Sequence, residues 1–298
     1  MTAAKKAAVT KKHRTLFIDY GSTPPGLHKT GPHLENYRRV YNASERATTP
    51  AKNSPQSLAD YLAMYEKANA RHVVIKARDI ETTFGFRIKN EDVAAFCEKH
   101  GPRYIGFAGV DPNKGMTAIR ELEHAVKNLG LRGLNLQCFE NKLRINDAKM
   151  FPLYAKCIEL DIPVNIHCST NFSTATSMDY GRPQYLDDVM VHFPELRVCA
   201  SPPGWPWVPE LLAVAWRHAN VWIGVVAVRP KYLAVENSGY EMLLQYGNTV
   251  LKDQMIFGSA YPMQPIERCV GEVTALPLKE EVRQKWLHDN AARFLGLA

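Results

Sequence analysis

Several side chains that can bind a metal ion or move a proton fall at the ends of short apolar runs in this 298-residue sequence. Asp19, Cys138 and His167 each lie at or near the end of such a run. If the runs are strands of one barrel, period-two alternation is expected to send the Asp19 carboxylate into its interior. A Cys, His and Asp set favours a soft ion such as zinc. These three residues are therefore candidate ligands of a zinc site.

The same residues allow two other interpretations. Cysteine is commonly a small buried residue, and Cys168 is expected to point away from the side on which His167 lies. Without a metal, Asp19 and His167 could instead transfer protons as catalytic residues. A nearby arginine could then bind the carboxylate of a small substrate such as a hydroxy acid. The candidates near strand ends are Arg78, Arg144 and Arg229.

Histidines outside the apolar runs are weaker candidates. His28 and His33, in the stretch GLHKTGPH, could fold over the mouth of a barrel as ligands or as acid and base, although histidines in surface loops usually do neither. His192 and His218 precede strands. They are expected at the opposite rim of the barrel, with structural roles.

The elements that must position these residues alternate along the chain. Helix patterns, such as 57–70 with Leu58, Leu62 and Tyr65 on one face, lie between apolar runs that read as strands. Near-continuous apolar strands that alternate with helices favour parallel pairing, because both faces of such a sheet are covered. The eight runs are 16–21, 72–77, 104–110, 133–137, 163–168, 196–201, 221–228 and 255–260. They predict an α/β fold, a single (β/α)8 TIM barrel over residues 15–298.

Two segments stand apart from this alternation. The loop 22–56 is long and rich in Pro, Gly, Asn and Thr, and in a barrel it is expected at the C-terminal face as a lid or an interface. Residues 1–14 contain five lysine and arginine residues and no acidic residue. We expect this segment to be a disordered basic tail.

Composition excludes several classes of protein. Five of the seven net positive charges lie in the tail, so the body is nearly balanced and has no basic stripe of the kind that nucleic-acid binding needs. No apolar run is long enough for a membrane span, and no secretory signal is recognisable, so a cytoplasmic protein is expected. The six cysteines form no CxxC pair and are expected to be free thiols.

Motifs along the body resemble those of a known family. The segments 145–169, which ends in NIHCS, 185–223, which contains ASPPGWPW, and 253–270, which contains FGSAYP, precede a final NAARFLGL. Together they resemble the amidohydrolase-related branch of the amidohydrolase superfamily, which includes metal-dependent decarboxylases, hydrolases and hydratases. The resemblance implies a divalent metal held by an HxH pair after the first strand, a His after the fifth and an Asp after the eighth. It also implies a catalytic His after the sixth strand.

This sequence departs from the family pattern at most of those positions. Gly21 and Thr23 stand where the HxH pair is expected, Pro202 replaces the catalytic histidine, and Ala260 replaces the aspartate. Only His167 matches. Three protein ligands are the usual minimum for a catalytic zinc, so we expect the family's metal centre to be absent here.

Three functions follow as expectations. The first is a non-catalytic or accessory subunit, a pseudoenzyme in a dimer or hetero-oligomer with a homologous, metal-bearing amidohydrolase subunit that acts on a small carboxylate-bearing substrate. The alternative is a hydrolase, lactonase or decarboxylase-like enzyme that needs no metal or uses a relocated ion at His167. A ligand-binding module that uses the mouth of the barrel is a third, weaker possibility.

Overall fold

A computed structural model describes residues 16–27, 33 and 57–297 of the chain. The expected basic tail, residues 1–14, lies outside the described residues. So do His28 and most of the loop 22–56.

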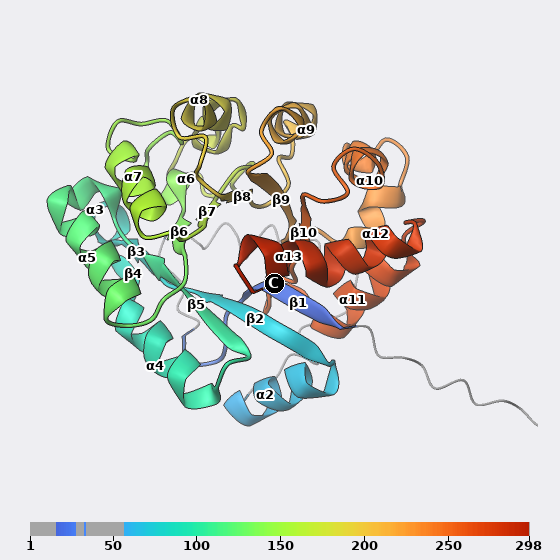
Figure 1. Ribbon diagram of the computed structural model, residues 1–298, viewed down its shortest axis with the longest axis horizontal. Helices are drawn as coiled ribbons and strands as arrows, with labels where there is room; N and C mark the ends of the chain where they lie inside the picture. Colours follow the sequence, from blue (N-terminus) through green and yellow to red (C-terminus); the bar gives the residue numbers. More distant parts are fainter. Residues whose placement is uncertain (1–15, 28–32, 34–56, 298) are drawn as a thin grey trace, which may run out of the picture.

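Eight parallel strands form a barrel, as the sequence predicts (Figure 1). Their order around the sheet follows their order along the chain, and a parallel bridge between Ser22 and Tyr261 joins the last strand region to the first. The Thr23 backbone N–H also donates to the Tyr261 carbonyl at 2.9 Å. The strands are β1 (Phe17–Ser22), β2 (Ala70–Lys76), β5 (Tyr104–Gly109), β6 (Leu134–Leu136), β7 (Val164–Ile166), β8 (Val198–Ala200), β9 (Val221–Val225) and β10 (Met255–Phe257). The prediction of a single (β/α)8 TIM barrel is confirmed.

Helices surround the strands (Figure 1). Helix α2 begins at the Ser57 N-cap, whose hydroxyl accepts a hydrogen bond from the Asp60 N–H at 3.1 Å. The outer helices are α2 (Leu58–Lys67), α4 (Asn90–His100), α5 (Met116–Lys127), α7 (Phe151–Glu159), α8 (Gln184–His192), α9 (Val208–Arg217), α10 (Glu241–Gly247) and α11 (Ile266–Ala275). The chain then runs through α12 (Glu280–Gln284), a π-helical turn (Lys285–Asp289) and α13 (Asn290–Phe294). Short 3-10 turns span Pro112–Lys114, Met178–Gly181 and Pro230–Ala234.

A small hairpin interrupts the regular alternation directly after β2. Its strands, β3 (Arg78–Ile80) and β4 (Phe86–Ile88), pair antiparallel on either side of the short helix α3 (Glu81–Phe84). A second short helix, α6 (Cys138–Asn141), follows β6 directly. The sequence alternation did not predict either insertion, and both carry residues of the site described below.

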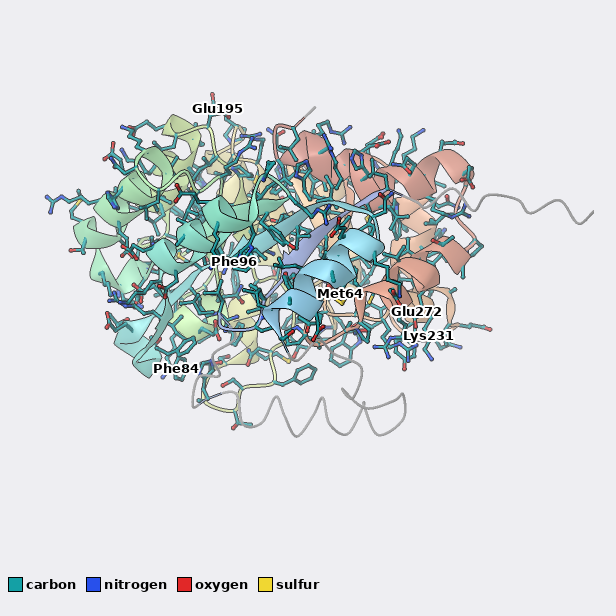
Figure 2. The ribbon with its side chains drawn as sticks, turned by 90° about the horizontal axis from the view of Figure 1, so that it is seen from below. Met64, Phe84, Phe96, Glu195, Lys231 and Glu272 are labelled. Atoms are coloured by element: carbon teal, nitrogen blue, oxygen red, sulfur yellow. The ribbon has the colours of Figure 1, made fainter. Side chains whose placement is uncertain are left out.

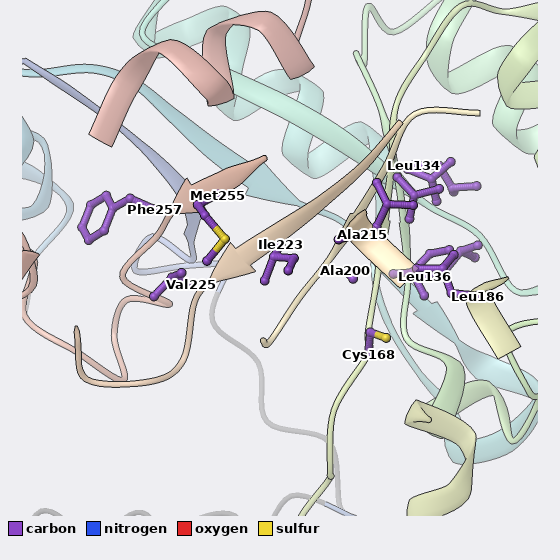
Figure 3. Close-up of a cluster of buried hydrophobic side chains, with 14 of the residues drawn as sticks. Leu134, Leu136, Cys168, Leu186, Ala200, Ala215, Ile223, Val225, Met255 and Phe257 are labelled. Carbon is purple, nitrogen blue, oxygen red and sulfur yellow. The ribbon is translucent and has the colours of Figure 1, made fainter. Parts of the chain in front are cut away.

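Apolar side chains form two layers, one on each face of the barrel wall. The outer layer lies between strands and helices. Figure 3 shows part of it, with Leu136 of β6 beside Leu186 of α8, and Ile223 of β9 farther along the same layer. The inner layer fills the barrel with residues such as Tyr20 and Phe107, and Phe294 of α13 packs against it. The end of the chain accordingly lies near the centre of Figure 1, beside β1.

Candidate active site

Asp19 is fully buried, but its carboxylate faces α2 and the end of β10 instead of the barrel interior. It accepts hydrogen bonds from the Tyr65 hydroxyl at 2.6 Å and from the Ser259 N–H and hydroxyl at 2.7 and 2.6 Å. A fourth comes from the Gly21 N–H at 3.2 Å. Burial raises the pKa of Asp19, and these hydrogen bonds oppose the rise. The carboxylate therefore ties three elements together.

The expectation that alternation sends Asp19 into the barrel is wrong, and the reason is a bulge in β1. Asp19 is opposite Val73 and Ser22 is opposite Ile75, so three steps along β1 match two along β2. Because of the extra residue, Gly21 faces inward although Asp19, two residues earlier, faces outward. An ideal Cβ at Gly21 would lie 3.7 Å from Lys76 Nζ, inside the barrel.

Cys138 and Cys168 lie in the outer apolar layer, on the opposite face of the wall from the barrel interior (Figure 3 shows Cys168). Burial raises the pKa of the Cys138 thiol to about 12, so it stays protonated at neutral pH. Within the described ranges, no three His, Cys, Asp or Glu side chains are grouped so that they could hold a metal ion. The candidate ligands Asp19, Cys138 and His167 are thus not gathered at one point.

His167 follows β7 and lies in a nearly closed environment, with 6% of its surface exposed. Its ring packs against Phe139, with 4.4 Å between ring centroids. Burial lowers the pKa of His167, the Glu140 charge opposes this and the Arg78 charge adds to it, which leaves the pKa at about 4. The imidazole is therefore neutral at pH 7 and can either accept or donate a proton.

Glu140 forms the centre of a buried ionic cluster next to His167. Its Oε1 lies 2.8 Å from His33 Nε2 and accepts a hydrogen bond from Arg78 Nη1 at 3.2 Å. The Glu140 and His33 side chains are each only 1% exposed. Burial alone would raise the pKa of Glu140, but the Arg78 charge and the His33 hydrogen bond outweigh it and the pKa is lowered. Glu140 is consequently a carboxylate at neutral pH.

The two inserted elements and the first loop supply this cluster. Arg78 opens the hairpin, Glu140 lies in α6, and His33 comes from the loop 22–56 and stacks on Phe84 of α3 at 4.1 Å. The sequence-based idea that His33 folds over the mouth agrees with this placement. Glu140 was missed because nothing local in the stretch QCFEN distinguishes it from a surface glutamate.

Lys76 ends β2 and points into the barrel, where it contacts side chains of β1 and β7. Its Nζ lies 4.0 Å from the centre of the Tyr20 ring and donates to Asn165 Oδ1 at 3.0 Å. Asn165 in turn donates to Asn135 Oδ1 at 2.9 Å, and Gln137 donates to the same oxygen at 3.0 Å. Burial lowers the pKa of Lys76 to about 8. Sequence reasoning missed this residue, although a lysine inside the apolar run HVVIKA was a usable signal.

Four buried polar atoms of the Glu140 cluster and its neighbour have no hydrogen-bond partner in the part of the chain that the structure describes. They are His33 Nδ1, Arg78 Nε, Glu140 Oε2 and His167 Nδ1. Buried polar groups are nearly always paired, so this concentration at one place is unusual. Each atom retains the capacity to bond a further polar group, and a small polar molecule could engage several at once.

The remaining candidates are occupied elsewhere. Arg144 pairs with Asp179 at 2.9 Å, and Arg229 pairs with Glu272. Glu272 also accepts from the Lys231 N–H, and Figure 2 shows these two residues next to each other, on the opposite side of the view from Phe84. His218 and His192 pair with acidic side chains of α8. Of the three candidate arginines, Arg78 is the one that contacts the cluster.

Replacements in the family's metal pattern leave few donors at the mouth. Gly21 has no side chain, Pro202 has no donor or acceptor on its ring, and Ala260 carries only a methyl group. Thr23 has only a hydroxyl. A side chain at position 21 would contact Val226 and the Lys76 amine. The positively charged Lys76 amine thus lies next to the position where the family pattern has a histidine that binds the metal ion.

Comparisons with known proteins agree with this architecture. The family model described as Amidohydrolase matches residues 31–297. An uncharacterised TIM-barrel protein from Bordetella bronchiseptica superposes with a TM-score of 0.79 and 27% identity, over 95% of this chain and 99% of that one.

More distant solved structures share the fold. A 2,6-dihydroxybenzoate decarboxylase aligns with a TM-score of 0.64 and 14% identity, over 95% of this chain and 99% of that one. The 5-carboxyvanillate decarboxylase of Sphingomonas paucimobilis aligns with a TM-score of 0.63 and 17% identity, over 96% of this chain and 99% of that one.

One curated relative matches over a short stretch. The 2-amino-3-carboxymuconate-6-semialdehyde decarboxylase of Dictyostelium discoideum is 27% identical over 78 residues. The match covers 26% of this chain and spans 22% of that relative's length.

Proposed function

Since this chain belongs to the amidohydrolase family, we propose that it is a decarboxylase-like enzyme that acts on a small carboxylate-bearing molecule without a metal ion. The observation that carries the proposal is the group of four unpartnered polar atoms around Glu140 and His167. Decarboxylation is the reaction we favour because the named enzymes among its structural neighbours and its curated relative include several decarboxylases.

The residues present do not fit the divalent metal that the family pattern implies. His167 is the one family ligand retained, and Gly21 and Ala260 offer no donor atom. The Lys76 amine, with a pKa of about 8, is largely protonated at pH 7 and would repel a dication beside Gly21. We therefore route no step of the reaction through a metal.

In the proposed mechanism positively charged side chains of this chain, in place of a metal ion, stabilise the negative charge of the substrate. Arg78 and Lys76 attract the substrate carboxylate, and Glu140 holds Arg78 and His33 in place. When the bond to the carboxylate breaks, its electron pair stays on the substrate carbon, which must then gain a proton. Neutral His167 can relay that proton, with one ring nitrogen donating to the carbon while the other takes up a proton from solvent, and a positioned group of this kind contributes about 10²–10⁴-fold to a rate.

The test measures CO2 release from small aromatic and oxo acids after dialysis of the protein against a chelator. We expect activity to survive dialysis and to fall about 10²–10⁴-fold in His167→Gln. His218→Gln is the matched control. His218 is another largely buried imidazole, and its Nε2 lies 2.7 Å from Asp187 Oδ1, in a part of the protein separate from the cluster. Full activity in His167→Gln would remove His167 from the mechanism, and no release from any acid would contradict the proposal.

A second candidate is the accessory role expected from the sequence, in which the barrel supports a metal-bearing homologous subunit. Loss of donors at Gly21, Pro202 and Ala260 favours it, and so do large apolar side chains exposed on neighbouring helices. Trp216 of α9 is 58% exposed and Val191 of α8 is 52% exposed. Co-expression with a homologue that retains the ligands, followed by measurement of native mass, tests this role. Two separately migrating chains would exclude it for that pair.

A further inference from the structure

Lys76 is a partly buried amine that the reaction outlined above uses only as a charge. We propose that Lys76 forms a Schiff base with the carbonyl group of a small 3-oxo acid at the mouth of the barrel. This inference rests on the proposed function and names its substrate class. A lysine serves as a nucleophile of this kind when its surroundings favour the neutral amine and leave its nitrogen free to attack.

The immediate surroundings of Lys76 Nζ contain no acidic partner among the residues that the structure describes. Its contacts are one amide oxygen, Asn165 Oδ1 at 3.0 Å, and the face of the Tyr20 ring at 4.0 Å. Lys114 provides a contrast within the same protein. Its Nζ pairs with Asp79 at 2.5 Å and Glu81 at 2.9 Å, which is the usual arrangement for a partly buried lysine.

The two lysines differ in protonation as a result. Burial lowers the pKa of Lys76 to about 8, whereas the carboxylates around Lys114 raise its pKa. At pH 8 about half of the Lys76 amines are therefore neutral, compared with less than about one in a hundred for a lysine of ordinary pKa. The neutral amine is the form that attacks a carbonyl carbon.

The position of Lys76 brings a covalently held substrate close to the polar cluster. Arg78 lies two residues beyond Lys76, and His167 lies two residues beyond the hydrogen-bond partner Asn165. Two residues along a strand span about 6–7 Å. A carbonyl carbon joined to Lys76 Nζ, beside Asn165, is therefore about one such step from His167, and the Arg78 charge already acts on this amine.

Gly21 keeps the approach to the amine open. Any side chain at this position would begin 3.7 Å from Lys76 Nζ and 3.4 Å from Val226 Cγ1. The histidine expected there from the family pattern would therefore occupy the space in front of the nitrogen. With glycine, the space beside Nζ is available to a substrate.

The chemistry balances without an added redox partner. The neutral amine attacks the carbonyl carbon, a proton moves from nitrogen to oxygen, and a second proton from solvent lets that oxygen leave as water, which gives a protonated imine. The bond to the carboxylate then breaks, CO2 leaves, and its electron pair flows to the imine nitrogen to give an enamine. Neutral His167 then delivers a proton to the enamine carbon from one ring nitrogen while its other ring nitrogen takes up a proton from solvent. Addition of water to the resulting imine releases the ketone and regenerates Lys76.

Reductive trapping tests the proposal directly. The full-length protein is incubated with acetoacetate and cyanoborohydride, and adducts are located by mass spectrometry of the intact chain and its peptides. We expect one adduct on Lys76, partly as the whole acid and partly lighter by one CO2. The yield should be half-maximal near pH 8, following the pKa of Lys76.

Two variants make the result specific. Lys76→Arg keeps a positive charge but cannot form an imine, and it should lose the adduct, whereas Lys114→Arg should retain it. An absence of adduct at Lys76 in folded protein, labelling spread evenly over surface lysines, or a yield that rises only near the ordinary lysine pKa of about 10.4 would overturn the proposal.

The outcomes also separate this inference from the proposed function. CO2 release without any adduct overturns the Schiff base and leaves decarboxylation standing. An adduct found only as the whole acid supports the Schiff base and contradicts decarboxylation.

Discussion

At the scale of single residues, burial sets the protonation state of the groups at the mouth. The pKa of His167 is lowered to about 4, and the pKa of Lys76 to about 8. Glu140 is equally buried, but the Arg78 charge and the His33 hydrogen bond keep its pKa low. The mouth thus holds two bases that are easily neutral, and one of them, His167, feels the charge of the Glu140 carboxylate, a combination suited to proton transfer and nucleophilic attack.

The lowered pKa of His167 predicts a loss of stability in acid. The unfolded chain binds a proton near the usual histidine pKa of about 6.5, whereas folded His167 resists protonation down to about pH 4. Stability therefore falls as pH drops through this window, by about 2 kcal/mol between pH 7 and pH 5 from this residue. Urea unfolding of the wild type and His167→Gln at both pH values measures the difference.

The variant should lose correspondingly less stability than the wild type over that interval, because it has no imidazole to protonate. His218→Gln controls for loss of a histidine that pairs with Asp187. Parallel pH dependence in wild type and His167→Gln would show that His167 is not held neutral in the folded protein.

At the scale of elements, β1 shows both the strength and the limit of reading this chain from its sequence. The apolar run 16–21 correctly predicted a strand in register with seven others. The direction of Asp19 was predicted wrongly because the bulge before Ser22 shifts the alternation, and a bulge leaves no clear trace in apolar periodicity. Eight strands support the prediction of the fold, so one irregular strand does not change it. The direction of the Asp19 side chain depends on the local geometry of β1 alone.

The polar cluster was only partly predictable for a similar reason. His167 was found because it ends an apolar strand within a recognisable motif. Arg78 and Glu140 are 62 positions apart in the sequence. They come into contact because each lies in a short insertion, Arg78 in the hairpin around α3 and Glu140 in α6. A contact between residues so far apart in the sequence depends on how the barrel closes, and a local sequence pattern cannot predict it.

The contacts of Asp19 predict that Tyr65→Phe destabilises the fold. The change removes the hydroxyl that donates to the buried carboxylate at 2.6 Å, and a hydrogen bond to a charged group contributes about 1.5–3 kcal/mol. We expect a loss of that size in chemical denaturation and unchanged turnover. Tyr185→Phe, which removes a bond to the more exposed Asp179, should cost less than about 1 kcal/mol. Similar costs for both variants would contradict a special role for the Asp19 cluster.

At the scale of the whole molecule, the barrel is closed at one end by its own C-terminal helix and bears its polar groups at the other. Phe294 packs against Tyr20 and Trp222 inside the barrel, with ring centroids 5.6 and 5.1 Å apart. Within the described ranges, no helix has the length and apolarity needed to cross a bilayer. The mouth, bordered by the hairpin and α6, is therefore where we expect small molecules to bind.

Thermal unfolding tests the lack of a metal centre for the molecule as a whole. A ligand that binds the folded state raises the melting temperature according to its concentration and affinity. Because His167 is the one family ligand retained, we expect added zinc or manganese, or prior dialysis against a chelator, to leave the melting temperature unchanged. A rise with metal that disappears in His167→Gln would show that the barrel binds an ion after all.

Gly21 and Lys76 also limit which substitutions each other's position can accept. An imidazole at position 21 and the Lys76 amine would compete for one space, since a Cβ at Gly21 already lies 3.7 Å from Nζ. Gly21→His should therefore be destabilising in the presence of Lys76 and tolerated better with Lys76→Ala, a coupling that a double-mutant cycle measures. The metal-dependent and lysine-based arrangements are then alternatives separated by an unstable intermediate. A change from one arrangement to the other would then require paired substitutions at positions 21 and 76.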